Sequence, residues 1–244
     1  MNTDPITVGY ANSIQTLGTL DGPGVRFVLF LQGCNLRCGC CHNPDTWERG
    51  GTPVTVREIV DKAERYRVYF GKKGGITVTG GEPLLQAEFV TALFRECHAR
   101  GIHTCLDTSG SIQSDATRAL LAETDRVLLD VKYPTDAQYR AYVGCGIETP
   151  LRFLTELNVR KIPVTLRQVV IPTLNDNEEN ARFLASLLDA HPAIDTVELL
   201  PFRKLCTVKY EKLGIDFRFG GLDEPTPERV KWLYDRIEAY RSIT

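Results

Sequence analysis

Three cysteines carry the clearest chemical signal in this sequence. Cys34, Cys38 and Cys41 are spaced four and then three residues apart. Thiolates are the protein ligands of iron–sulfur clusters, and three thiolates in one loop can surround a single four-iron cube and leave one iron open to a small molecule. A zinc site is the alternative. Zinc normally takes a fourth cysteine or histidine, and the nearby Cys40 and His42 adjoin Cys41 in an extended loop, where neighbouring side chains point in different directions.

The other cysteines are scattered along the chain, at Cys97, Cys105, Cys145 and Cys206. A disulfide framework is typical of small secreted domains, and neither the length of 244 residues nor the N-terminal sequence fits one. Because cysteine is readily buried as a small apolar residue, we expect these four to lie in the core rather than to bind a metal.

Strand and helix patterns alternate around the cysteine loop. Residues 25–31 are almost continuously apolar, as in a strand buried on both faces. Thr55 and Glu58 have the spacing of a capping box that opens a helix, as do Thr135 and Gln138. Gly101 is placed to end a helix as a left-handed cap. Further strands are predicted at 76–79, 102–106, 126–131, 164–171 and 197–200, and further helices from 86, at 151–158, at 178–188 and from 227.

Strands that alternate with crossover helices predict a parallel sheet. The pattern contains six strand–helix units, fewer than the eight that close a full barrel. We therefore predict an α/β fold with an incomplete parallel (β/α)6 barrel, formed as a single domain over residues 1–244 with the cysteine loop at 33–47. An open, doubly wound sheet is the alternative architecture.

Polar residues gather just after the predicted strands. In parallel α/β folds, ligands bind at the carboxyl ends of the strands, so we expect a functional site along this edge. The segments concerned are the cysteine loop, 81–82, 107–108, 130–132 and 201–203.

The charge composition gives no indication of a nucleic-acid or membrane partner. The formal net charge is −2, so no global field draws the chain to nucleic acid or to an anionic membrane. Residues 1–5 lack the basic start of a signal peptide, and no apolar run approaches the length of a membrane span. We expect a cytoplasmic protein.

The ordered set of motifs resembles the radical S-adenosylmethionine (radical SAM) superfamily, whose signature is CxxxCxxC, and within it the activating enzymes of glycyl radical enzymes. The resemblance covers nearly the whole chain in order. It rests on the segments 21–26, 34–47, 79–83, 86–89, 101–108, 129–132, 167–172 and 199–202. It implies a [4Fe–4S] cluster held by Cys34, Cys38 and Cys41, with S-adenosylmethionine bound to the open iron. It further implies hydrogen abstraction from a backbone glycine of a partner enzyme, with pyruvate formate-lyase favoured.

The same resemblance implies roles for other residues. A monovalent cation would be held by Asp107, Thr108 and Asp130. The turn Asp21-Gly22-Pro23-Gly24 would lie near the entrance for the protein substrate. The residues expected to contact the cofactor are Cys40, Cys41, His42, Gly80, Gly81, Glu82, Asp107, Asp130, Val131, Lys132, Arg167 and Arg203. For Arg167, a salt bridge within the barrel is the alternative to an anion contact.

Two residues depart from the family pattern. Cys40 stands where the family usually has an aromatic residue, which removes ring stacking but keeps main-chain contacts. Arg203 stands where related sequences have a histidine, and a guanidinium is always charged and only donates hydrogen bonds. Residues 216–225 depart as well. These differences leave the chemistry in place but weaken the assignment of one particular protein substrate.

Other functions remain open at this point. Many related activators carry a cysteine-rich ferredoxin-like insert, which this chain lacks because no cysteine occurs between Cys41 and Gly80. That absence favours activation of pyruvate formate-lyase, with a flavodoxin or ferredoxin as electron donor. The alternatives are activation of another glycyl radical enzyme, radical chemistry on a small molecule, and an iron–sulfur sensor without enzymatic activity.

Overall fold

The computed structural model describes residues 7–241. The N-terminal residues 1–5, used above to argue against a signal peptide, lie outside the described residues. None of the helices in the described part of the chain is both long and apolar enough to span a membrane.

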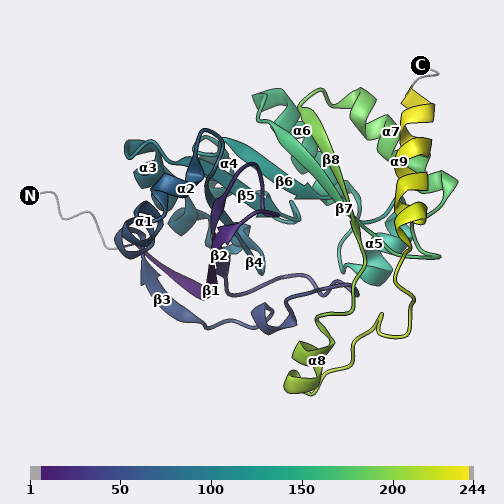
Figure 1. Cartoon of the computed structure of the whole chain (residues 1–244), viewed down its shortest axis with the longest axis horizontal. Coiled ribbons are helices and arrows are strands. Elements are labelled where there is room, and N and C mark those ends of the chain that lie inside the picture. The colour runs from purple at the N-terminus through teal and green to yellow at the C-terminus, as the bar shows by residue number, and fades with distance from the viewer. Residues whose placement is uncertain (1–6, 242–244) are drawn as a thin grey trace, which may run out of the picture. The chain divides into compact units, whose positions relative to one another are not determined.

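The chain alternates between strands and helices, as Figure 1 shows. The strands are β1 (Val8–Gly18), β2 (Arg26–Leu31), β3 (Thr52–Thr55), β4 (Gly75–Gly80), β5 (His103–Thr108), β6 (Arg126–Asp130), β7 (Val164–Val170) and β8 (Ile194–Pro201). The α-helices are α1 (Val56–Glu64), α2 (Arg67–Phe70), α3 (Ala87–Ala99), α4 (Asp115–Leu121), α5 (Asp136–Tyr142), α6 (Glu148–Arg160), α7 (Glu178–Ala190), α8 (Thr207–Leu213) and α9 (Pro227–Arg241). Two 3-10 turns are η1 (Pro44–Thr46) and η2 (Pro83–Gln86).

The described strands follow the order β3-β1-β2-β4-β5-β6-β7-β8. The pairs β2/β4, β4/β5 and β7/β8 are parallel, as predicted. All six predicted strands are present, but the sequence patterns missed β1 and β3. Both are antiparallel additions at one end of the strand order, since β1 pairs antiparallel with β2 and with β3. The parallel part of the sheet therefore matches the prediction, and its edge does not.

The chain divides into two compact units. Unit 1 contains Met1–Asn35 and Thr46–Leu128, and unit 2 contains Leu36–Asp45 and Leu129–Thr244. The single domain predicted from the sequence stays a prediction. In unit 1, the buried strands β2 and β4 form the centre of the core. In unit 2, α7 and α9 each bury an apolar face, with Leu184, Leu188, Leu233 and Ile237 inside.

Local signals for helix ends were largely correct. The Thr55 side chain accepts from the Glu58 N–H and the Glu58 carboxylate accepts from the Thr55 N–H, which is a complete capping box. Thr135 caps α5 by accepting from the Gln138 N–H, but the Gln138 side chain accepts from the Thr135 hydroxyl instead of its N–H. That second box is therefore only half formed. Gly101 has the predicted left-handed conformation, with φ +65°.

Candidate functional site

The first cysteine of the loop belongs to unit 1, where the two ends of the loop are tied together. The Gly33 N–H donates to the Thr46 carbonyl at 2.8 Å, and the Cys34 N–H donates to the Trp47 carbonyl at 3.1 Å. Cys34 follows β2 directly and is half-buried. Its position is therefore fixed by the main chain on both sides of the loop.

The end of β4 approaches the start of this loop closely. The Glu82 N–H donates to the Gly33 carbonyl at 2.8 Å. A side chain at Gly81 would place its Cβ 2.0 Å from the same carbonyl oxygen, and Gly80 has φ +117°. Glycine is needed at both positions for these reasons. In unit 1, the close approach that these glycines allow is thus to the main chain before Cys34. Their predicted contact with the cofactor stays a prediction.

The Glu82 carboxylate joins the carboxyl ends of β4 and β5. It accepts from the Thr108 hydroxyl at 2.6 Å, from the Ser109 N–H at 3.0 Å and from the Leu84 N–H at 3.1 Å. Burial raises the pKa of Glu82, and the hydrogen bonds from Ser109 and Thr108 oppose that rise. Glu82 holds this edge of the sheet. Beside it, Asp107 accepts from the Thr79 hydroxyl at 2.9 Å.

The other cysteines of the loop belong to unit 2. The Gly39 N–H donates to the Tyr142 carbonyl at 2.8 Å, and the Cys41 N–H donates to the Cys38 carbonyl at 3.1 Å in a tight turn. Cys38 and Cys41 are half-buried, whereas Cys40 is 6% exposed. Burial raises the pKa of the Cys40 thiol to about 11. Cys40 is therefore built into the core of unit 2, and the predicted ligands Cys38 and Cys41 are more accessible.

Asp130 and Lys132 form a close ion pair at the end of β6. The Lys132 Nζ lies 2.6 Å from the Asp130 Oδ2, and the two side chains are 12% and 27% exposed. Burial is the largest influence on the pKa of Lys132 and would lower it, but the Asp130 carboxylate, its hydrogen bond to Lys132 and the nearby Cys38 and Cys40 together outweigh burial and hold this pKa well above its usual range. Lys132 is therefore a fixed positive charge.

A buried amide network holds the main chain of this pair. The Asn175 Nδ2 donates to the Lys132 carbonyl at 3.0 Å, and the Gln168 Nε2 donates to the Val131 carbonyl at 3.0 Å. The Lys132 N–H donates to the Tyr139 hydroxyl at 2.8 Å. The sequence patterns missed Asn175, Gln168 and Tyr139. A signal was available in the run of polar side chains at 175–177, which lies between the predicted strand 164–171 and the predicted helix 178–188.

Two predicted arginines make ion pairs within unit 2. Arg167 faces Glu198 across the β7/β8 ladder, with Nε 3.2 Å from Oε2. This is the salt bridge foreseen as an alternative for Arg167. The Arg203 Nη1 lies 2.8 Å from the Glu224 Oε2, and the Arg203 carbonyl is 2.8 Å from the His42 Nε2. The unusual Arg203 is thus paired with a residue of the unusual segment 216–225. The cofactor contacts of both arginines and of His42 stay predictions.

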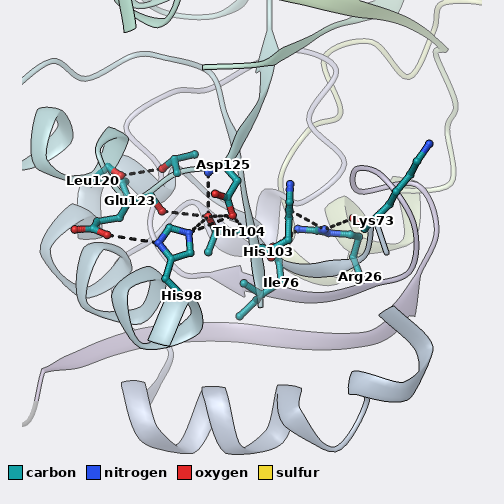
Figure 2. Close-up of polar contacts among 10 residues, drawn as sticks. Arg26, Lys73, Ile76, His98, His103, Thr104, Leu120, Glu123 and Asp125 are labelled. Carbon is teal, nitrogen blue, oxygen red and sulfur yellow. Dashed lines mark hydrogen bonds and ion pairs between the residues drawn. The ribbon is translucent and has the colours of Figure 1, made fainter. Parts of the chain in front are cut away.

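The turn Asp21-Gly22-Pro23-Gly24 lies at the amino ends of the parallel strands β2 and β4. Thr77, near the start of β4, donates to the Asp21 carbonyl at 2.6 Å. Arg26 is fully buried, and its Nη1 is 3.5 Å from the Pro23 carbonyl and 3.2 Å from the Lys73 carbonyl. Figure 2 shows the Arg26 guanidinium beside Lys73, Ile76 and His103. This turn therefore sits at the opposite ends of β2 and β4 from Cys34 and Glu82. Its predicted role as an entrance stays a prediction.

The donor chemistry fits an iron–sulfur cluster. All eight cysteines lie in the described part of the chain and carry thiols rather than disulfides. The three at the motif positions are half-buried, and they lie within one loop whose ends and turn are hydrogen-bonded. Within residues 7–241, no group of three histidine, cysteine, aspartate or glutamate side chains is placed so that it could hold a metal ion, so the fit rests on the donor type and on the spacing of the motif. Cys97, Cys105 and Cys206 are buried as expected, and Cys145 is half-buried.

Comparisons with known proteins give a consistent picture. Residues 28–185 match the radical SAM superfamily. The pyruvate formate-lyase-activating enzyme of Clostridium pasteurianum is 40% identical over 230 residues, which cover 93% of this chain and 96% of that protein. The enzyme of the same name from Staphylococcus epidermidis is 38% identical over 244 residues, covering 96% and 95%.

Among solved structures, a domain of a pyruvate-formate lyase-activating enzyme from Bacteroides vulgatus is similar, with a TM-score of 0.58 and 22% identity. The match covers 68% of this chain and 94% of that one. At this level of identity it shows the fold alone. The fold class predicted from the sequence, an incomplete barrel of radical SAM type, is confirmed.

Proposed function

Because this chain belongs to the radical SAM superfamily, and within it to the family of pyruvate formate-lyase-activating enzymes, we propose that it activates pyruvate formate-lyase. The activation removes a hydrogen atom from the α-carbon of one glycine in the partner enzyme. The observation that carries the proposal is the identity of 40% over 93% of the chain to an enzyme of that name.

The cluster ligands are Cys34, Cys38 and Cys41. When bound, a reduced [4Fe–4S] cluster supplies the electron that splits S-adenosylmethionine into methionine and a 5′-deoxyadenosyl radical, which takes the hydrogen atom. Support for this ligand set comes from its spacing, its half-buried thiols and the hydrogen-bonded loop that presents them. The burial of Cys40 in the core of unit 2 supports leaving it out of this set.

Other residues of the chain bind and orient the cofactor. The fixed charge of Lys132 and the carboxylate of Asp130 offer one group of each sign to a cofactor that carries both an amino and a carboxylate group. Arg167 offers a second positive charge, shared with Glu198. Because Gly80 and Gly81 have no side chains, the end of β4 lies close to the start of the cysteine loop. Asp107 and Thr108 complete the cofactor edge in unit 1, and with Asp130 they supply oxygen ligands for a monovalent cation.

The remaining partners follow from the same activity. A flavodoxin or ferredoxin donates the electron, and the protein works in the cytoplasm without nucleic acid or membrane. Supporting points are the net charge of −2 and the lack of a spanning helix among the described residues. The turn 21–24 faces the protein substrate.

Anaerobic reconstitution with iron and sulfide, followed by a chemical reductant and S-adenosylmethionine, tests the proposal. We expect 5′-deoxyadenosine and, with pyruvate formate-lyase present, a glycyl radical signal in the electron paramagnetic resonance (EPR) spectrum. Cys34→Ala, Cys38→Ala and Cys41→Ala should each abolish both products. Cys145→Ala is the matched control, because Cys145 is also half-buried but lies outside the loop.

The outcomes separate the alternatives. A cluster without any 5′-deoxyadenosine would leave the iron–sulfur sensor. Turnover of S-adenosylmethionine without a glycyl radical on pyruvate formate-lyase would rule out this partner and leave another glycyl radical enzyme or a small-molecule substrate.

A further inference from the structure

The segment 203–224 of unit 2 carries α8 and contacts the cysteine loop repeatedly; we call it the α8 arm. The Tyr210 hydroxyl donates to the Cys41 carbonyl at 3.0 Å. The Lys209 Nζ donates to the Asn43 Oδ1 at 2.8 Å and to the Asp45 Oδ1 at 2.9 Å. Through Lys209 and Tyr210, the arm therefore bonds the loop at Cys41, Asn43 and Asp45.

Resting on the function proposed above, we propose that Lys209 and Tyr210 are positioning residues that hold Cys41 in the conformation that binds the cluster. Neither residue belongs to the motifs of the cysteine loop or of the strand ends, and their role is separate from ligation itself.

The position of the Tyr210 hydroxyl is fixed by the packing of its ring. Its side chain is 3% exposed, and its ring stacks on Phe217 with centroids 4.5 Å apart. A stacked, buried ring fixes the position of its hydroxyl. The hydrogen bond therefore orients the peptide group that directly follows the Cys41 ligand.

Lys209 acts on the next stretch of the loop. Asn43 and Asp45 flank Pro44, the first residue of η1. One ammonium group that binds both side chains holds the chain on either side of this proline. In the same stretch, the Asn43 N–H lies 3.4 Å from the Cys41 Sγ. Fixing Asn43 therefore also fixes a hydrogen-bond donor to the ligand sulfur.

A third contact of the arm explains a glycine in the motif. A side chain at Gly39 would place its Cβ 2.5 Å from the ring of Phe219. The arm thus packs directly against the turn between Cys38 and Cys41. Apart from η1 at its end, the loop segment 38–45 has no helix or strand of its own, so the α8 arm supplies contacts that regular secondary structure provides elsewhere.

The test measures how firmly the cluster is held, independently of catalysis. Reconstituted wild-type protein is compared with Lys209→Met, Tyr210→Phe and the double variant. Anaerobic release of iron to a ferrous chelator gives a rate, and EPR spectra of the reduced cluster are recorded with and without S-adenosylmethionine. Lys212→Met makes the same change on an exposed residue of α8. Tyr234→Phe removes a hydroxyl that accepts from the Leu199 N–H instead of contacting the loop.

We expect the double variant to release iron about tenfold faster than wild type, since residues that orient metal ligands typically affect binding by this much. The release rates of the single variants should lie between those of wild type and the double variant. Lys209→Arg should release iron almost as slowly as wild type. The EPR spectrum of the double variant should change, whereas the thermal unfolding midpoint of the cluster-free protein should stay close to that of the two controls.

Release rates equal to those of Lys212→Met and Tyr234→Phe would overturn the proposal. The proposal would also be overturned if Lys209→Arg released iron as fast as Lys209→Met and both variants lowered the unfolding midpoint of the cluster-free protein. In that case the arm would only stabilise unit 2. Failure of the wild-type protein to bind any cluster would instead contradict the proposed function.

Discussion

Replacing Asn175 by alanine should destabilise the protein strongly and loosen Lys132. Asn175 is fully buried. Its Oδ1 accepts from the Ile171 N–H at 2.7 Å, and its Nδ2 donates to the carbonyls of Lys132 at 3.0 Å and Val169 at 2.8 Å. The Asn175→Ala substitution leaves these three main-chain groups without that partner, in a place where water has little access.

The expected loss follows from these contacts. A buried polar group that loses its partner costs about 1 to 3 kcal/mol. The two carbonyls each keep a second lone pair for other partners, so we place the total near the lower end of the sum, at about 3 kcal/mol. Urea denaturation of the cluster-free protein measures it, provided that the slope of the transition is unchanged.

A matched control is Asn12→Ala, because the Asn12 side chain donates one part-buried hydrogen bond to Gln32 at 3.0 Å. We expect it to cost less than about 1 kcal/mol. An Asn175→Ala loss no larger than this control would refute the reasoning. In the reconstituted protein, weaker binding of S-adenosylmethionine by about tenfold is expected as well; unchanged affinity would show that the network does not hold Lys132 for the cofactor.

Three further substitutions test residues of unit 1. Burial raises the pKa of Glu82 above its usual 4.5, so its contribution to stability falls as the pH rises past that value. Glu82→Gln removes this titration, and the stability difference between wild type and variant should shrink as the pH rises above 4.5; denaturation curves that show it growing would contradict this. Burial and the Arg26 charge lower the pKa of His103 below 6.5, so the unfolded chain takes up this proton first and stability should fall below about pH 6.5. His103→Gln should flatten that fall, and a slope unchanged by it would assign the effect elsewhere. Arg26→Met removes a buried cation that serves several carbonyls and should cost about 3 kcal/mol or more in thermal or urea unfolding; a loss below about 1 kcal/mol would mean that water replaces it.

Features encoded in a few neighbouring residues could be predicted from the sequence. The capping box of Thr55 and Glu58 and the left-handed Gly101 formed as expected. The strand β2 was recognisable because burial on both faces leaves an almost continuous apolar run. Cys34, Cys38 and Cys41 stood out because their spacing is itself the signal.

Features that depend on distant partners could not be predicted. β1 has a mostly exposed pattern with two register irregularities against β2, so neither an apolar run nor a clean alternation marks it. Lys209 and Tyr210 contact residues more than 160 positions away. Asn175 serves Lys132, 43 positions earlier. Nothing local distinguishes Lys209 and Tyr210 from ordinary residues of a helix, and the polar run at 175–177 does not show which main-chain groups Asn175 holds.

The contacts of the turn 21–24 determine which of its residues can change during evolution. Arg26 and Thr77 recognise it through the carbonyls of Asp21 and Pro23, which every amino acid carries. Gly24 is different, because it has φ +71° and a Cβ there would lie 2.6 Å from the Gly74 nitrogen. Substitutions of Pro23 should therefore leave the fold intact, whereas substitutions of Gly24 or Arg26 should disrupt it. A lineage that changes its protein partner could replace the half-buried side chains of Asp21 and Pro23 while keeping the same backbone.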